Sequence, residues 1–176
     1  WAHAVAFVHT LRISIVIILA KVVLDLHFYV RRSTGPFIST SAYAWLVALG
    51  GTVAPLLLRP TADESDFLPG TMLLIIGVAL QIYVFRTLNG SFEAVGRRGV
   101  RGDGLYRFVR HPLYLAFILS QYGYVLCHTS LYNIAICALV IYLQVLRINE
   151  EERLLQEDEK FQEYAEQTPW RILPKV

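Results

Sequence analysis

The chain has 176 residues, a formal net charge of +2, and hydrophobic residues at 55% of its positions. This apolar content exceeds the roughly 45–50% of soluble globular domains, and it is gathered into blocks of about the 20 residues that cross a bilayer. The small net charge argues against a nucleic-acid partner, because proteins that bind nucleic acid display a strongly basic surface. We therefore predict a single all-α domain over residues 1–176, an integral membrane bundle of about five transmembrane helices.

Five apolar blocks follow one another along the chain. They cover about residues 4–30, 42–58, 69–88, 112–126 and 131–148. We expect the first two to be transmembrane helices 1 and 2, within residues 1–66, and the other three to lie in a core of residues 67–176. Only the turn CHTS joins the last two blocks, which predicts an antiparallel hairpin of helices 4 and 5. The acidic segment that follows is expected to form a polar helical tail.

Two features of the first half bear on helix packing. Lys21 and Asp25 are four residues apart on one helical face, a spacing that lets them neutralise each other or face the bundle interior. Gly50 and Gly51 suit close contact between helices, and Pro55 should kink the second helix near its end.

The orientation in the membrane follows from the Lys and Arg residues of the loops. Arg31 and Arg32 follow helix 1, and six arginines lie between Arg86 and His111, whereas the loop after helix 2 has only Arg59. Alternation then predicts an outside N-terminus, with the Arg-rich loop and the C-terminal tail in the cytoplasm.

The segment GDGLYRFVRHPLYLAF, residues 102–117, is the strongest local motif. Pro112 is expected in the first turn of helix 4, directly after His111. Such a helix end presents backbone N–H groups and a partial positive charge, which suit a carboxylate. Arg110 and His111 add donors, and Tyr106 and Tyr114 can supply ring faces for a purine or a sulfonium cation.

A second polar segment, RINEEERLL, continues helix 5 beyond the membrane and places Arg147, Glu151 and Glu152 within about one turn. Because helices 4 and 5 form a hairpin, the two segments should meet on the same side of the membrane. A charged or zwitterionic ligand can then be held between them.

Simpler interpretations also stand. The arginines are consistent with topology signals alone, and the glutamates with a solvated helix end. Cys127 and Cys137 are predicted to be buried hydrophobes rather than a disulfide, and the histidines lack metal-ligand spacing, so no metal site is predicted.

Taken together, these motifs resemble the isoprenylcysteine carboxyl methyltransferase family of integral membrane methyltransferases, whose relatives include the bacterial phospholipid N-methyltransferases. The resemblance covers about residues 70–176 and rests on RTLNGSF (86–92), RGV (98–100), GLYRFV (104–109), RHPLY (110–114), RINEE (147–151) with Glu152 and Leu155, and Tyr164 with RILP (171–174).

The resemblance implies S-adenosylmethionine as cofactor, in a pocket open to the cytosol, and an acceptor that enters laterally from the lipid. It implies these cofactor-binding residues: Tyr106, Arg110, His111, Pro112, Tyr114, Glu151 and Glu152. The predicted catalytic residues are Arg147, which would orient an acidic acceptor, and Glu151 or Glu152, which would bind the cofactor ammonium or accept a proton from an amine.

Departures from the family pattern leave the acceptor open. Asn89 and Ala116 stand where many relatives have glycine, and EDEKF replaces a common FG pair after the glutamates. A prenylated carboxylate, a lipid amine and a lipid thiol all fit. The alternatives to a methyltransferase are an NADPH-dependent membrane reductase of the sterol-reductase type and a non-enzymatic membrane scaffold.

Overall fold

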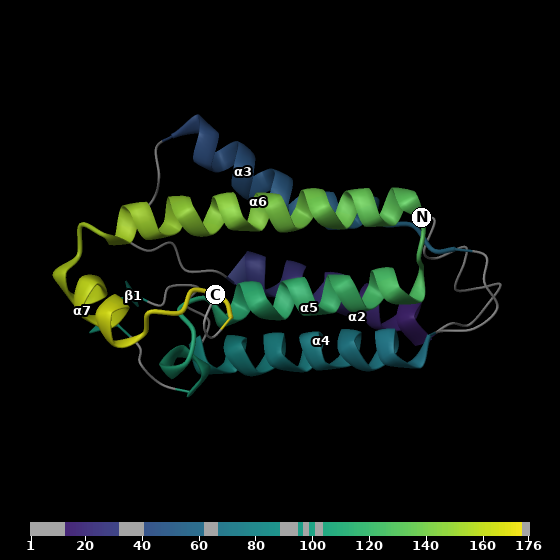
Figure 1. The fold of residues 1–176 in the computed structure, drawn as a ribbon, viewed down its shortest axis with the longest axis horizontal. Helices are drawn as coiled ribbons and strands as arrows, with labels where there is room; N and C mark the ends of the chain where they lie inside the picture. Colours follow the sequence, from purple (N-terminus) through teal and green to yellow (C-terminus); the bar gives the residue numbers. More distant parts are fainter. Residues whose placement is uncertain are drawn as a thin grey trace.

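The computed structural model describes residues 13–31, 41–61, 67–88, 95–96, 99–100 and 104–173. Its long helices are α2 (Ile13–Arg31), α3 (Ala42–Val53), α4 (Leu68–Leu88), α5 (Pro112–Cys127) and α6 (Leu131–Leu155) (Figure 1). Each helix falls on one of the five apolar blocks, which confirms the helical architecture. The described residues of the Arg-rich loop add one element that was not predicted, an antiparallel pair of strands, β1 (Val95–Gly96) and β2 (Gly99–Val100).

Local signals explain where the helices begin and end. Pro112 is the first residue of α5, as predicted, with His111 as its N-cap. The side chain of Ser130 caps α6 by accepting a hydrogen bond from the backbone of Asn133 (3.1 Å). At Pro55 the α-helical geometry of α3 gives way to the short 3₁₀ helix η1 (Ala54–Leu57), because proline has no N–H to donate.

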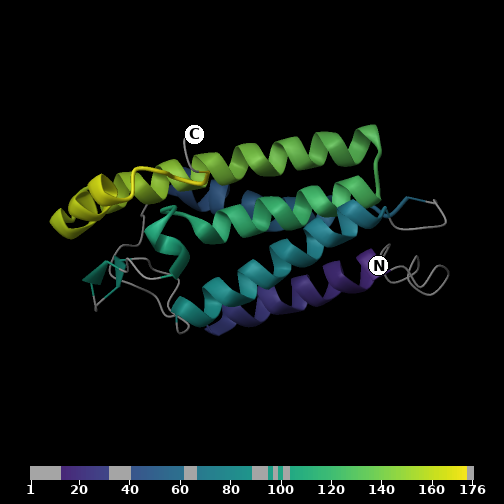
Figure 2. The same ribbon diagram turned by 60° about the horizontal axis from the view of Figure 1, so that its bottom comes forward.

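Alternating helix directions bring the polar segments to one end of the bundle. Helices α2, α4 and α6 run toward this end, and α3 and α5 run away from it; Figure 2 shows α2 lying along α4. The end also holds the 3₁₀ helix η2 (Gly104–Arg107) and the predicted polar tail, α7 (Glu159–Gln167). We call it the polar end; the α5–α6 turn lies at the opposite end.

Small residues allow α4 and α5 to pack very closely. A Cβ atom added to Gly77 would lie 2.4 Å from the backbone nitrogen of Ser120, and one added to Gly123 would lie 2.4 Å from that of Leu74. Without a hydrophobic drive between helices in lipid, such close backbone approach supplies much of their attraction. Glycine at these two positions is therefore what lets α4 and α5 pack this closely.

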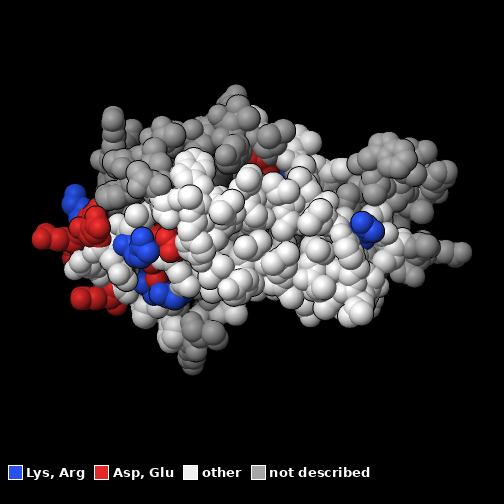
Figure 3. All heavy atoms as spheres, turned by 90° about the horizontal axis from the view of Figure 1, so that it is seen from above, with Lys and Arg blue, Asp and Glu red and all other residues white. Residues whose placement is uncertain are grey.

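The outer surface has the character of a protein that lies in lipid. Large apolar side chains are exposed on several helices, including Val23 (68%) and Leu46 (69%). Most of the charged side chains on the face in Figure 3 gather at one end, and the middle of that face is largely uncharged. Within the described residues, two helical stretches are long and apolar enough to cross a bilayer, Leu68–Thr87 and Leu131–Leu155, while Ala42–Leu57 and Pro112–Cys127 are apolar but shorter. The number of spans and the orientation stay predictions.

Two buried apolar clusters form the interior. One, at the polar end, joins η2 and α7 to the helices; the other lies deeper and includes Cys137. Cys127 and Cys137 are both buried and are not joined by a disulfide, as predicted. Three of the predicted topology arginines, Arg97, Arg98 and Arg101, and also Asn89, lie outside the described residues.

Candidate functional site

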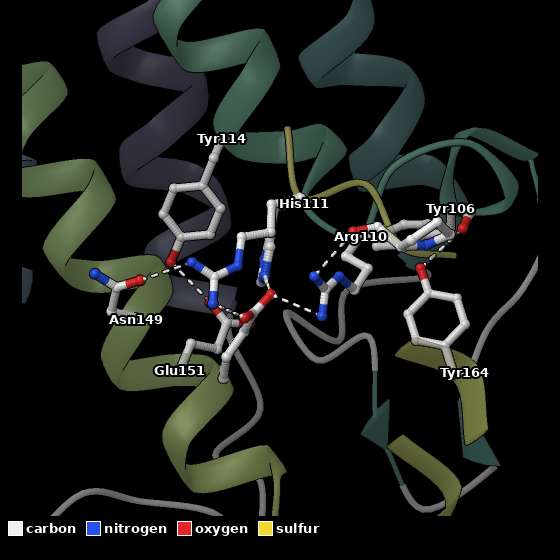
Figure 4. A network of polar contacts seen from close by, with 10 residues as sticks. Tyr106, Arg110, His111, Tyr114, Asn149, Glu151 and Tyr164 are labelled. Atoms are coloured by element: carbon white, nitrogen blue, oxygen red, sulfur yellow. Dashed lines mark hydrogen bonds and ion pairs between the residues drawn. The ribbon is translucent and has the colours of Figure 1, made fainter. Parts of the chain in front are cut away.

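The antiparallel hairpin of α5 and α6 brings the two predicted polar segments into direct contact. Helix α5 begins at Pro112, and α6 runs past this point as far as Leu155. His111 Nε2 therefore lies 3.0 Å from Glu152 Oε1 (Figure 4). Both side chains are almost fully buried, with 5% and 3% of their surface exposed.

Glu152 is surrounded by positive charge. Arg110 Nη1 lies 3.4 Å from its Oε1 atom, and Arg171 Nη2 lies 2.8 Å from its Oε2 atom. A buried carboxylate is tolerated only where charged partners and hydrogen bonds replace the lost water. Glu152 thus holds together three segments: the start of α5, the end of α6 and the C-terminal segment.

Tyr114 and Glu151 form a second pair beside the first. The Tyr114 hydroxyl donates a hydrogen bond of 2.8 Å to Glu151 Oε2. The tyrosine ring stands edge-on to His111, with centroids 5.5 Å apart, and the guanidinium carbon of Arg147 lies 5.6 Å from the ring centroid. Arg147 and Glu151 are only half-buried, so this second pair is more accessible than the pair of His111 and Glu152.

The C-terminal segment closes part of the helix end that was predicted to bind an anion. The backbone N–H groups of Arg110 and His111 donate to the carbonyls of Trp170 (2.8 Å) and Arg171 (2.9 Å), and Arg110 Nη2 donates to the Pro169 carbonyl (3.1 Å). This end is therefore less open than the sequence alone suggests, because a segment about 60 residues away along the chain supplies its hydrogen-bond acceptors.

Arg171 was not predicted as a site residue. Besides its ion pair with Glu152, it donates to Asn149 Oδ1 over 3.2 Å. The only signal in the sequence was its place in the RILP motif, which contributed to the family resemblance but indicated no contact.

Tyr106 lies deeper than its predicted role as a ring face suggests. It is 4% exposed and belongs to the apolar cluster at the polar end, together with Phe161 and Tyr164 of α7. The Tyr164 hydroxyl donates to the Tyr106 carbonyl over 2.8 Å. Burial raises the pKa of Tyr164 to about 12, against the opposing charge of Arg110. A contact between Tyr106 and a ligand stays a prediction.

One buried donor of the site has no partner within the described parts of the chain. The Nε atom of Arg110 is inaccessible to solvent and makes no hydrogen bond to those residues, although an unpaired buried donor is costly. The guanidinium groups of Arg110 and Arg147 offer positive charge to a carboxylate, and Glu151 offers an acceptor to an ammonium group. This set fits a zwitterionic ligand such as S-adenosylmethionine. Among the described residues, no group of three or more His, Cys, Asp or Glu side chains is placed to hold a metal ion.

A comparison with known families identifies the same part of the chain. The family model described as phospholipid methyltransferase matches residues 66–158, which includes helices α4, α5 and α6 and both polar segments of the site. This match confirms the predicted relationship to integral membrane methyltransferases. No curated protein matches the chain significantly.

Proposed function

The chain belongs to the phospholipid methyltransferase family, and from this premise we propose that it transfers a methyl group from S-adenosylmethionine to a lipophilic acceptor embedded in the membrane. The observation that carries the proposal is the junction of His111 and Tyr114 with Glu152 and Glu151 at the polar end of the bundle. Every one of these residues lies within the segment that the family model matches.

The two glutamates have different surroundings, and we assign them different roles. Glu152 is buried and already paired with Arg110, His111 and Arg171, so it is a positioning residue that fixes the basic groups. Glu151 is half-buried and holds the Tyr114 hydroxyl, which leaves carboxylate lone pairs for the ammonium group of the cofactor. The guanidinium groups of Arg110 and Arg147 would hold the cofactor carboxylate by their positive charge.

S-adenosylmethionine supplies a methyl group on a positively charged sulfur. In the transfer, the sulfur–methyl bond breaks as the acceptor nucleophile forms a new bond to the methyl carbon, and the sulfur leaves as a thioether. The protein needs to do little covalent chemistry. Holding the two reactants in line can lower the barrier by about 7–11 kcal/mol, and the exclusion of water by the buried cluster favours the nucleophile.

The acceptor would enter from the lipid, because the helices that lead to the site expose apolar side chains along their length. The arginine distribution of the sequence favours the cytoplasm as the side on which the polar end lies. A prenylated carboxylate, a lipid amine and a lipid thiol are the acceptor classes for this site.

The test compares cofactor binding by Glu151→Gln and Glu150→Gln in the purified full-length protein. Glu150 is the residue before Glu151 on α6 and pairs with Arg153 at 3.7 Å, so it is a matched control outside the site. We expect the wild type and Glu150→Gln to bind S-adenosylhomocysteine, with at least tenfold weaker binding by Glu151→Gln. The wild type should also transfer labelled methyl groups to a hydrophobic component of a membrane extract. Saturable binding of NADPH without S-adenosylhomocysteine binding would overturn the proposal in favour of a reductase.

A further inference from the structure

Two groups of buried polar side chains lie inside the bundle, apart from the candidate site. In the first, Lys21 Nζ is 2.6 Å from Asp25 Oδ2, and Gln81 also donates to Asp25. Lys21 is 3% exposed, so the pair is both neutralised and turned into the bundle, the two options that the sequence left open. The second group, at the end opposite the site, surrounds His128, a fully buried side chain that the methyl transfer does not use. Because histidine titrates near neutral pH, its contacts decide how this end responds to acid.

The hydrogen bonds of His128 require a neutral ring. The backbone N–H of Thr61 donates to Nδ1 over 3.1 Å, and the Thr61 hydroxyl oxygen lies 3.3 Å from the same atom. A backbone N–H can only donate, so Nδ1 must carry a lone pair and the ring proton must be on Nε2. Nε2 lies 3.0 Å from Ser14 Oγ, which can accept its hydrogen bond. A protonated ring carries an N–H at both nitrogens, so it would set a donor against the Thr61 N–H.

His128 joins segments that are far apart in the sequence. Ser14 belongs to the first turn of α2 and Thr61 follows η1, while His128 itself is the C-cap of α5. Asn133 of α6 strengthens these contacts, since its amide bonds the backbone of Arg59 and the carbonyl of His128. We call the contacts among these five residues the histidine junction. The junction fastens the start of α2 and the segment after η1 to the α5–α6 turn.

Titratable and charged groups reach the junction from each segment that meets there. Tyr124 of α5 stacks on the His128 ring, with centroids 4.4 Å apart, and α2 contributes an uncharged serine. Arg59, after η1, directs its guanidinium onto the Tyr132 ring of α6, 4.5 Å from the centroid. Three carboxylates of the next loop lie outside the described residues: Asp63, Glu64 and Asp66. Their titration has to be distinguished from that of His128 by experiment.

We propose that the histidine junction is an acid-sensitive lock, which closes the end opposite the site while His128 is neutral and opens when the ring takes up a proton. Opening exposes the ring to water, where a histidine binds a proton at about pH 6.5. Because the open form binds one proton more than the closed form, the equilibrium constant for opening should rise about tenfold for each pH unit below about 6.5. The predicted orientation places this end outside the cytoplasm, so acidity there is the signal. The inference does not depend on the proposed methyl transfer.

The principal test is hydrogen exchange of the Thr61 amide in purified full-length protein, at about pH 7.5 and about pH 5. The intrinsic rate of an unprotected amide at each pH, divided by the observed rate, gives a protection factor. We expect the protection factor of Thr61 in the wild type to fall at least about tenfold between the two pH values. That of Ser120, in the closely packed α4–α5 pair, should stay unchanged. Equal protection of Thr61 at both pH values would overturn the proposal.

Two variants identify the group responsible. The side-chain oxygen of His128→Asn can accept from Thr61 in place of Nδ1 but does not titrate, so Thr61 should be protected equally at both pH values. His128→Gln is a second variant that does not titrate; protection of Thr61 should be lower, but again equal at the two pH values. A fall that persists in either variant would overturn the proposal in favour of the loop carboxylates.

Thr129→Ala is the matched control, because Thr129 is the next residue, is exposed and leaves His128 in place. We expect its Thr61 amide to lose protection in acid as in the wild type. Loss of the pH dependence in Thr129→Ala would show that the turn, rather than the imidazole, controls opening, and would contradict the proposal.

Discussion

Glu152 Oε1 lies 3.0 Å from His111 Nε2, although the two residues are 41 positions apart in the sequence. The contact exists because α5 begins where α6 passes it, and it places a buried carboxylate among three basic side chains. The pair therefore joins the start of α5 to the end of α6 at the polar end.

Glu152→Ala is expected to lower the free energy of unfolding by about 3–5 kcal/mol, because it leaves buried positive groups without their partner. A double-mutant cycle with His111→Ala should show a coupling of about 0.5–3 kcal/mol. Arg153→Ala is the control, since its pair with Glu150 is 3.7 Å long and Arg153 is 69% exposed; we expect a change of about 0–1 kcal/mol there. Equal losses in Glu152→Ala and Arg153→Ala, measured by denaturation in detergent, would contradict this account.

Gly77→Ala is expected to destabilise the protein by about 1–3 kcal/mol, because its new Cβ atom would lie 2.4 Å from the backbone of Ser120 and force α4 and α5 apart. The matched control is Gly51→Ala in α3, whose Cβ would meet Gln144 at an ordinary 3.7 Å. That substitution should be neutral, or stabilising by up to about 1 kcal/mol through helix propensity. The measurement is the unfolding midpoint in detergent; a loss in Gly51→Ala as large as in Gly77→Ala would show that close packing is not the cause.

Asn133→Ala is expected to destabilise the end of the bundle that lies opposite the candidate site. The Asn133 amide is fully buried; its nitrogen donates to the carbonyls of Arg59 (2.7 Å) and His128 (2.6 Å), and its oxygen accepts from the Arg59 backbone (3.0 Å). Each buried group left without its partner costs about 1–3 kcal/mol. We therefore expect a loss of at least about 2 kcal/mol.

Hydrogen exchange checks this prediction, with faster exchange at Arg59 and Thr61 in Asn133→Ala. Thr129→Ala is the control, because Thr129 is exposed and, among the described contacts, its hydroxyl donates only to the carbonyls of Val125 and Leu126 in the last turn of α5. Unchanged exchange at Arg59 would show that the amide does not hold this end together.

The stability of the protein should fall at alkaline pH partly through Tyr164. Its pKa is raised in the folded chain from 10.0 to about 12, so the unfolded chain loses this proton first. The contribution of the buried neutral phenol is complete below about pH 10 and is lost as the pH rises toward 12. Tyr164→Phe should show a shallower decline over this range, whereas Tyr142→Phe, at a side chain that is 60% exposed, should follow the wild type. Identical profiles for Tyr164→Phe and the wild type would refute the assignment.

The sequence predicted the helical blocks, several of their limits and the meeting of the two polar segments. Those features depend on neighbours along the chain: the apolar block lengths, Pro112 at a helix start, and a turn too short to allow anything but a hairpin. The Lys21–Asp25 pair was predictable for the same reason, since its members are one helical turn apart.

Only the tertiary structure decided which distant groups meet. Nothing local to Arg171 indicates that it binds Glu152, that Gln81 contacts Asp25, or that Tyr106 is buried beneath α7. These contacts depend on how whole helices are shifted and rotated against one another, which is set by close packing such as that of Gly77 against Ser120. The local sequence pattern determines where each helix begins and ends. The many weak contacts between helices determine which polar side chains meet.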